Sequence, residues 1–334
     1  MKKIIINLVS VLLCLSCNKI ITNKTELINI EPSIVIDELS DSTFFRGISY
    51  MVYNDYIYAT DEQNGRVLKL DTNLKLFGTV GNSGQGPQEF AGIGNLAVWK
   101  DTVLALNYGG LALNTYLIDG KFIDRHSLRT DPSLTTNNFC LDNEGFLYFT
   151  SVLDSFPIVK YDRKMNRLFG FGEWIEPKNE EFRRFFNNYL ICYFDNKILT
   201  FQLDAPVVNM YEKDGRHLLK KEFSSQLFEK RLKFKKTEQE KDAANLKKVY
   251  MLFYSITSIN NKIYLLYIDH DNENYPNCNK VVELLYENND FVINQAYSLS
   301  RLSQDWFVSI VATNDHQIVA SNGSMAKLCV YQLN

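Results

Sequence analysis

The chain has 334 residues, of which 46% are hydrophobic and 22% are charged, and this balance excludes a disordered or collagen-like protein. Its 36 lysines and arginines stand against 39 aspartates and glutamates, so the formal net charge of -3 offers no bulk attraction to nucleic acid. Aromatic residues make up 13%, led by 22 Phe and 19 Tyr, and such side chains pack well on pleated surfaces. We therefore expect a folded, mostly β protein without a nucleic-acid partner.

The first segment of the chain has the pattern of an export signal. Lys2 and Lys3 precede an apolar run over residues 4–15 that is too short for a permanent membrane helix. The run ends on Ser16 and Cys17, which resembles the lipobox of bacterial lipoproteins, although Cys14 stands where that motif usually has leucine. The resemblance implies that residues 1–16 are a lipoprotein signal peptide, that Cys17 is lipidated, and that residues 17–32 form a tether to the membrane.

The lipid anchor would place the protein in the cell envelope. Residues 18–21 lack the acidic cluster that surface-exported lipoproteins of the resembling kind often carry. We therefore expect an outer-membrane anchor that faces the periplasm.

Four cysteines lie in the body of the chain, beyond the expected lipidation site at Cys17, and they are Cys140, Cys192, Cys278 and Cys329. They form no CxxC pair and no spacing typical of zinc ligands, so a zinc site is not expected. Export would permit disulfides, but the sequence does not show which pair could approach within bonding distance. We expect buried free thiols.

The body of the chain is a sixfold repeat of a polar turn followed by an apolar strand. The six copies occupy residues 54–61, 100–107, 143–150, 195–202, 260–267 and 314–321. A second strand series follows each copy and ends in an acidic or amide residue, and a third series precedes each copy. These strands are nearly continuous apolar runs, as expected when both faces of a sheet are covered. Repeats of this length indicate a propeller or a solenoid.

A fourth strand follows each of the first five units but is missing from the sixth, because the chain ends first. Residues 33–40, near the mature N-terminus, have the pattern of the missing strand and would pair on the outside of the last unit. This pairing closes a ring and removes the exposed sheet edges of an open array. The sequence therefore predicts an all-β, six-bladed β-propeller over residues 33–334 whose N-terminal strand completes the last blade.

Residues 59–71, ATDEQNGRVLKLD, resemble the strand-loop-strand signature of NHL-type propeller repeats, and residues 77–90 resemble the G-x-G-P-x-E-F loop that follows it. Together with the lipobox, these motifs are similar to those of the six-bladed β-propeller lipoproteins common in Bacteroidota. The resemblance implies a propeller fold and an envelope location, and it implies no uniform activity. The recognisable motifs are confined to the first blade and the loop after it, because the later blades have diverged from the signature sequence.

The long insertions should share one face of the propeller. Turns between strands one and two, and between three and four, are short and rich in Asn, Asp and Gly, as tight hairpins require. The long segments all belong to the opposite face, and they are residues 81–94, 173–187, 224–251 and 269–280. Residues 177–186 and 224–252 have short helical patterns. The second of these is either a solvated helical cover over the propeller mouth or an arm that docks a partner.

Local motifs for catalysis or metal binding are weak. Residues 81–87 lack the Lys-Ser/Thr of a phosphate loop. Asp269 begins an alternating acidic run similar to a calcium loop, but Asn274 stands where glycine is needed and Lys280 where a bidentate Glu belongs. The four histidines lie in different repeats without a metal-binding spacing, so we expect no cofactor unless the protein uses calcium.

Two functions are compatible with this sequence. The first is a non-catalytic, membrane-anchored recognition or scaffold propeller that binds a glycan, a peptide or an envelope protein, with Glu89, Trp174, His270 and Tyr275 as candidate contacts on the elaborated face. The alternative is an enzyme, such as a calcium-dependent lactonase or lyase, whose ligands come from several blades and meet in the central channel. Carboxylates or histidines converging there would favour the enzyme, whereas an aromatic or apolar mouth would favour binding.

Overall fold

The computed structural model describes most of the chain beyond residue 24. The described residues are 25–39, 44–128, 138–151, 154–175, 188–241, 250–272, 275–299, 306–323 and 325–333. Cys17 and the helix expected over residues 177–186 lie outside them. The described residues form six antiparallel β-sheets arranged as the blades of a propeller, with one small two-stranded sheet beside them.

The first three blades each contain four consecutive strands. Blade one contains β3 (Met51–Asn54), β4 (Tyr56–Asp61), β5 (Arg66–Leu70) and β6 (Leu76–Val80). Blade two contains β9 (Ile93–Trp99), β10 (Thr102–Asn107), β11 (Ala112–Leu117) and β12 (Phe122–Ser127). Blade three contains β13 (Phe139–Leu141), β14 (Leu147–Thr150), β15 (Ile158–Tyr161) and β16 (Arg167–Phe171). Between blades one and two, β7 (Asn82–Ser83) and β8 (Glu89–Phe90) pair in parallel.

The last three blades include both N-terminal strands. Blade four contains β17 (Tyr189–Phe194), β18 (Lys197–Gln202), β19 (Val207–Glu212) and β20 (His217–Glu222). Blade five contains β21 (Phe253–Ile259), β22 (Lys262–Asn272), β23 (Tyr275–Glu287) and β24 (Asp290–Ser298), with β1 (Leu27–Asn29) outside β24. Blade six contains β25 (Phe307–Asn314), β26 (Gln317–Asn322) and β27 (Lys327–Gln332), with β2 (Pro32–Ile36) outside β27.

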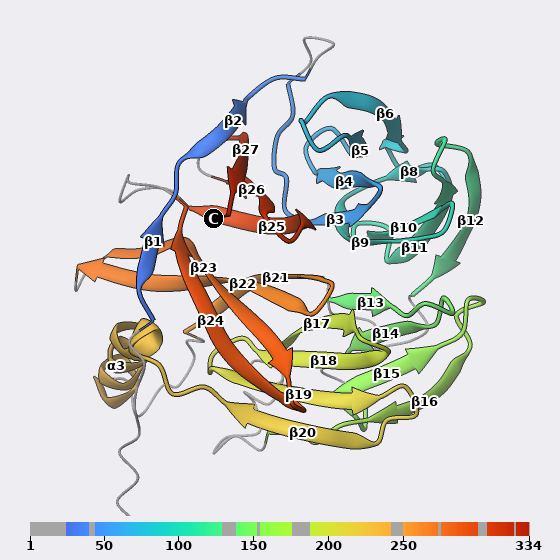
Figure 1. Ribbon diagram of the computed structural model, residues 1–334. Helices are drawn as coiled ribbons and strands as arrows, with labels where there is room; N and C mark the ends of the chain where they lie inside the picture. Colours follow the sequence, from blue (N-terminus) through green and yellow to red (C-terminus); the bar gives the residue numbers. More distant parts are fainter. Residues whose placement is uncertain are drawn as a thin grey trace, which may run out of the picture.

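The six blades form a closed ring. The first strands β3, β9, β13, β17, β21 and β25 each contact the first strand of the next blade, and β25 contacts β3. Figure 1 looks approximately along the central channel, with these strands around the centre and β2, β6, β12, β16 and β20 on the outside. The predicted six-bladed architecture is confirmed, and so is the closing strand, because β2 pairs antiparallel with β27.

Strand pairing begins before the boundary that the sequence indicated. The propeller was expected from residue 33, with residues 17–32 as an extended tether, but Leu27, Ile28 and Asn29 pair in parallel with β24. Ile30 is 7% exposed and packs into the core between blades five and six. The N-terminal segment therefore covers the outer edges of two neighbouring blades.

Turn chemistry explains why the face of the short hairpins is so compact. Asp55, Asp195 and Asn196 adopt positive φ in turns between first and second strands, and Gly120 and Gly215 do so after third strands. Asn, Asp and Gly tolerate this conformation best, which is why they recur there. The predicted tight turns on this face are confirmed.

One predicted loop is wrong. Residues 269–280 were expected to form a long insertion, but β22 and β23 continue through most of it as a hairpin, with Asp269 opposite Asn277. Asp269, the polar residue that begins this segment, is instead buried and paired. The Lys280 ammonium lies 2.6 Å from Oδ2 of Asp269, and both residues are less than a tenth exposed. The ion pair satisfies charges that would otherwise be costly to bury.

The described part of the insertion over 224–252 contains one helix, α3 (Gln226–Lys241), which starts after the capping Ser225. Phe228 is buried against the rings of Phe253 and Tyr267. Arg231, 7% exposed, donates from Nε to the carbonyl oxygen of Met251 at 2.8 Å. The helix is thus fixed to blade five on the face of the long insertions (Figure 1).

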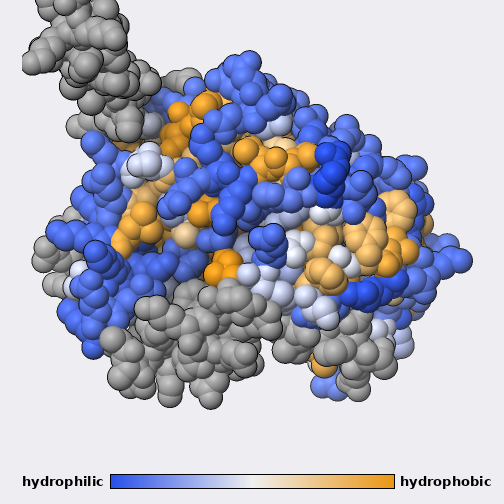
Figure 2. All heavy atoms as spheres, turned by 90° about the horizontal axis from the view of Figure 1, so that it is seen from below, coloured by the Kyte–Doolittle hydropathy of each residue, from blue (hydrophilic) through white to orange (hydrophobic). Residues whose placement is uncertain are grey.

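The core lies between neighbouring blades. One cluster joins blades four and five, with Leu199, Phe201 and Phe253 completely buried. The four cysteines from residue 140 onward are buried and free, as expected. Figure 2 shows one side of the molecule, where apolar residues form separate patches among hydrophilic ones. No described helix is long and apolar enough to cross a membrane.

Candidate functional site

The central channel contains a cavity with a volume of about 800 Å³. Its wall comes from the first strand of every blade and from residues next to those strands. Polar and aromatic members of the wall include Ser49, Tyr50, Tyr53, Glu62, Asn95, Tyr108, Asn138, Asn188, Tyr193, Tyr254, Ser255, Thr257, Ser258 and Ser309. A cavity of this size with a few convergent polar groups is typical of a ligand site.

Three tyrosines and one carboxylate gather where the channel opens on the face of the long insertions. Tyr50 precedes β3, Tyr254 lies in β21, and Glu62 and Tyr108 directly follow the second strands of blades one and two. We call these four residues the channel mouth. Burial raises the pKa of Tyr50 to about 12, and the nearby Glu62 carboxylate is the second cause, followed by the hydroxyls of Tyr254 and Tyr108. The four side chains therefore act on one another electrostatically.

Each tyrosine of the mouth is held by a separate contact. The Tyr50 backbone N–H donates to Thr60 Oγ1 at 3.1 Å, and Thr60 is fully buried. The Tyr254 ring packs edge-on against Trp306 with centroids 6.0 Å apart. Burial is the main reason that the pKa of Tyr254 is raised, and Glu62 adds to it.

Tyr108 depends on two glycines. A Cβ at Gly92 would come within 2.8 Å of the Tyr108 ring, and one at Gly94 would come within 3.2 Å. These two positions must therefore lack a side chain for the ring to lie where it does. Tyr108 stays 46% exposed, so its ring is accessible from the channel.

Glu62 is positioned by its neighbour in the sequence. Asp61, completely buried, accepts hydrogen bonds from Arg46 N, Asn64 Nδ2 and Arg66 Nε. This network fixes the loop after β4, and the Glu62 N–H donates to the Gly47 carbonyl oxygen at 3.2 Å. The Glu62 carboxylate forms no ion pair or side-chain hydrogen bond with the residues that the structure describes, and it is the one acidic side chain among the described residues of the wall.

Deeper in the channel, polar side chains connect neighbouring blades. Asn95 Nδ2 of blade two donates to the Phe139 carbonyl oxygen of blade three at 3.3 Å. Asn138 Nδ2 donates to the Tyr189 carbonyl oxygen of blade four at 3.0 Å and lies 3.3 Å from Asn188 Oδ1. The wall is thus lined by amides, hydroxyls and aromatic rings.

A metal site does not emerge from the described part of the chain. It contains no group of three or more His, Cys, Asp or Glu side chains arranged to hold an ion. Of the described residues that line the channel, only Glu62 is charged. The mouth is aromatic, which is the arrangement that we associated with binding.

None of the four contact residues predicted from the sequence is among those that line the channel, and of the four only His270 and Tyr275 share an element, the β22–β23 hairpin. Glu89 Oε2 accepts from Gly86 N at 2.7 Å within the loop between blades one and two. Trp174 Nε1 donates to the Ser155 carbonyl oxygen at 2.8 Å. His270, 4% exposed, stacks on Phe234 of α3 with centroids 4.2 Å apart. Tyr275 begins β23 opposite Asn272.

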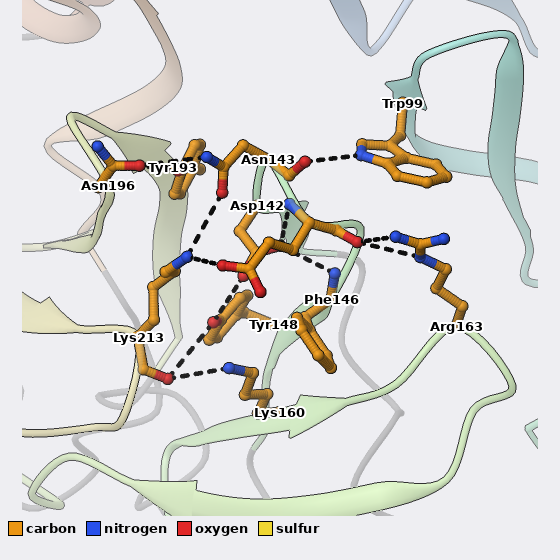
Figure 3. Close-up of polar contacts among 11 residues, drawn as sticks. Trp99, Asp142, Asn143, Phe146, Tyr148, Lys160, Arg163, Tyr193, Asn196 and Lys213 are labelled. Atoms are coloured by element: carbon orange, nitrogen blue, oxygen red, sulfur yellow. Dashed lines mark hydrogen bonds and ion pairs between the residues drawn. The ribbon is translucent and has the colours of Figure 1, made fainter.

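A second polar cluster lies on the opposite face, among the short hairpins, and Figure 3 shows it. Trp99 Nε1 of blade two donates to the Asn143 carbonyl oxygen of blade three at 3.1 Å. Glu144 pairs with Lys213 of blade four. The Arg163 guanidinium lies over the Trp99 ring at 3.8 Å. The polar groups of this cluster engage one another across three blades, so we assign it to stability.

Sequence reasoning missed the channel mouth, although the repeats carry a signal for part of it. Glu62, Tyr108 and Leu203 each follow the last residue of a second strand, and all three line the cavity. Aligning the repeats would therefore have identified this position as one that faces the channel. Tyr50 and Tyr254 carry no comparable local signal.

Comparisons with solved structures agree with this architecture. An exported protein from Bacteroides fragilis is 12% identical, with a TM-score of 0.54 and an alignment that covers 88% of each chain. A Bacteroides thetaiotaomicron protein of unknown function is 12% identical, with a TM-score of 0.56, and the match covers 92% of this chain and 75% of that one. A virginiamycin B lyase from Staphylococcus aureus is 10% identical, with a TM-score of 0.53, and the match covers 90% and 99%.

These likenesses show the fold alone, because the identities are low. No protein-family model matches the chain, and no curated protein matches it in sequence. The chain is therefore a six-bladed β-propeller similar to proteins of several kinds.

Proposed function

We propose that this protein is an extracytoplasmic, lipid-anchored recognition module that binds a glycan or a peptide in its central channel. The observation that carries the proposal is the channel mouth, where Tyr50, Tyr108 and Tyr254 line the cavity together with one carboxylate, above a wall that combines the amides of three asparagines with apolar side chains. Tyrosine rings offer apolar faces with a hydroxyl at the edge, and amides donate and accept hydrogen bonds. This combination suits a ligand that is polar yet carries apolar surface.

The geometry favours a binding function over a scaffold without a pocket. The cavity of about 800 Å³ falls within the range of small-molecule and oligomer sites. Its wall is rigid because Asn95 and Asn138 connect neighbouring blades. A preformed site loses little conformational entropy when a ligand binds.

An envelope location is supported by the sequence of the N-terminal segment. The basic pair, the apolar run and Ser16-Cys17 together fit an exported lipoprotein. The propeller begins at Leu27, so about ten residues separate Cys17 from the first strand. The wild type should incorporate a labelled fatty acid in cells, and replacing Cys17 with Ser should abolish the label. Equal labelling of the wild type and the variant would contradict the anchor.

The binding proposal is tested on the full chain, produced with its own N-terminal segment and purified in mild detergent. A glycan and peptide array identifies ligands, and calorimetry measures their affinity for the wild type and for Tyr108→Ser. We expect at least a tenfold loss in the variant, because its ring lies in the mouth. The control is Phe77→Ser, since Phe77 is 55% exposed on the outer strand β6.

Equal affinity of Tyr108→Ser and the wild type for every ligand found would overturn the channel as the binding site. A rise in melting temperature with added calcium, abolished by chelator, would favour the lactonase or lyase alternative instead.

A further inference from the structure

The channel mouth carries a negative charge, which the binding of a neutral ligand would not require. Glu62 is the one charged side chain among the described residues that line the cavity, and neither lysine, arginine nor histidine is present among them. A carboxylate without a counter-charge in the surrounding wall makes the local potential at the mouth negative.

The carboxylate is also left available by the surrounding structure. Arg46 N, Asn64 Nδ2 and Arg66 Nε donate to Asp61, the residue immediately before it, rather than to Glu62. Among the described residues, none offers Glu62 a side-chain donor or an ion pair. A half-buried carboxylate without a partner gains most from a cation that enters beside it.

Three tyrosines line the same end of the cavity as this carboxylate. Burial and Glu62 together raise the pKa of Tyr50, and the two other tyrosines contribute to the same shift, which places all four side chains within electrostatic range. Ring faces attract ammonium and guanidinium groups, and desolvation strengthens this attraction. A carboxylate among tyrosines is therefore suited to an organic cation.

We infer that the ligand presents an organic cation, an ammonium or guanidinium group, to Glu62 between Tyr50, Tyr108 and Tyr254. This inference rests on the proposed function and adds the chemistry of the group that enters the mouth. Glu62 supplies the counter-charge, and the rings supply cation–π contacts and exclude water. Elsewhere in the wall, amides and hydroxyls hold the uncharged part of the ligand.

The first test compares charged probes with neutral ones of the same shape on the wild-type full chain. Choline and n-butylammonium are the cations, and 3,3-dimethylbutan-1-ol and n-butanol are their neutral counterparts. Titration calorimetry at low ionic strength should show at least tenfold tighter binding of each cation, weakening as salt is added. Equal binding of cations and neutral counterparts would overturn the inference, and this comparison requires no variant to fold.

The second test uses paired variants. Glu62→Gln keeps the shape and removes the charge, so it should weaken choline binding at least tenfold, whereas Glu229→Gln on exposed α3 should leave it unchanged. Tyr108→Phe keeps the ring and should bind within about threefold of the wild type, while Tyr108→Leu should lose at least fivefold. Melting curves confirm that each variant is folded.

The outcomes separate this inference from the function that it extends. A neutral glycan or peptide that depends on Tyr108 but not on Glu62 would keep the channel as the binding site and overturn the cation. Choline binding that is indifferent to Glu62→Gln would also overturn it. Ligand binding that is unchanged by every substitution at the channel mouth would reject both proposals.

Discussion

The last residue of the second strand has the same structural role in several blades, where its buried side chain accepts backbone hydrogen bonds. Asp61, Asn107 and Asn322 are all buried, and each accepts hydrogen bonds from backbone groups of the following loop or its neighbours. Asn107 Oδ1 accepts from Gly110 N and Ala91 N, and its Nδ2 donates to the Glu89 carbonyl oxygen. These anchors hold Glu62 and Tyr108 at the channel mouth, because those two residues come next in the chain.

Removing the Asp61 anchor should cost much of the stability of blade one. Asp61→Ala removes the buried carboxylate that accepts from Arg66 Nε, Arg46 N and Asn64 Nδ2, and breaking a buried pair in this way typically costs about 3–5 kcal/mol. The measurement is urea unfolding at pH 7, compared with Asp71→Ala. Asp71 accepts two backbone hydrogen bonds in an exposed turn, where the loss should be about 1 kcal/mol. Similar losses in both variants would contradict the anchor role.

At the scale of elements, the N-terminal strands decide whether the ring closes. β2 completes blade six, with Ile34 opposite Val330 and Ile36 opposite Leu328. Ile34 and Ile36 pack against the core between blades six and one, while Val35 points away and is 47% exposed. Because successive side chains point to opposite faces of the strand, β2 can complete the last blade with one face and remain exposed to solvent on the other.

A charged side chain on the inner face of β2 should destabilise the pairing of β2 with β27 that closes the ring. Ile34→Asp places a carboxylate against the apolar cluster and should destabilise the protein by about 2 kcal/mol or more, since its charge loses water without gaining a partner. Hydrogen exchange should rise in β2 and β27 before it rises in blade three. Val35→Asp, on the same strand, is the control and should change stability by less than about 0.5 kcal/mol. An equal rise in hydrogen exchange across all blades would contradict the expectation that Ile34→Asp first opens the pairing of β2 with β27.

At the scale of the whole molecule, buried hydroxyls and thiols make the fold sensitive to high pH. Burial raises the pKa of Tyr50, Tyr211 and Tyr297 to about 12, and that of the Cys192 thiol to about 12. The usual values are about 10 for tyrosine and about 8.5 for cysteine. In each case the unfolded chain releases its proton at lower pH than the folded protein does, so alkali favours unfolding.

We therefore expect stability to be flat from pH 7 to about 8 and to fall as pH rises towards 12. These tyrosine and cysteine side chains contribute their full stabilisation at pH values below their pKa in the unfolded chain. The contribution is lost as the pH rises through their pKa in the folded protein. Absorbance at 295 nm should show a large share of the 19 tyrosines ionising together with unfolding, as followed by circular dichroism. Ionisation of all tyrosines near pH 10 in a protein that stays folded would contradict this expectation.

The sequence by itself determined the architecture, because that information is local and repeated. Turn residues such as Asp55 and Asn196 fix the hairpins, and the strand that is missing after β27 has its match in residues 33–40. The same local reasoning failed over residues 269–280, where Asn and Asp suggested a loop. There the pairing of β22 with β23 and the buried contact between Asp269 and Lys280 outweigh turn propensity.

Only the tertiary structure decided which side chains meet at the channel. Tyr50, Glu62, Tyr108 and Tyr254 come from three blades, and apart from the repeat position that Glu62 and Tyr108 share, nothing in their local spacing shows that they converge. Strands buried on both faces do not reveal by their pattern which residues face the channel and which face the next blade. The closure of the ring brings these distant residues together, so the candidate site is a property of the assembled propeller rather than of any one repeat.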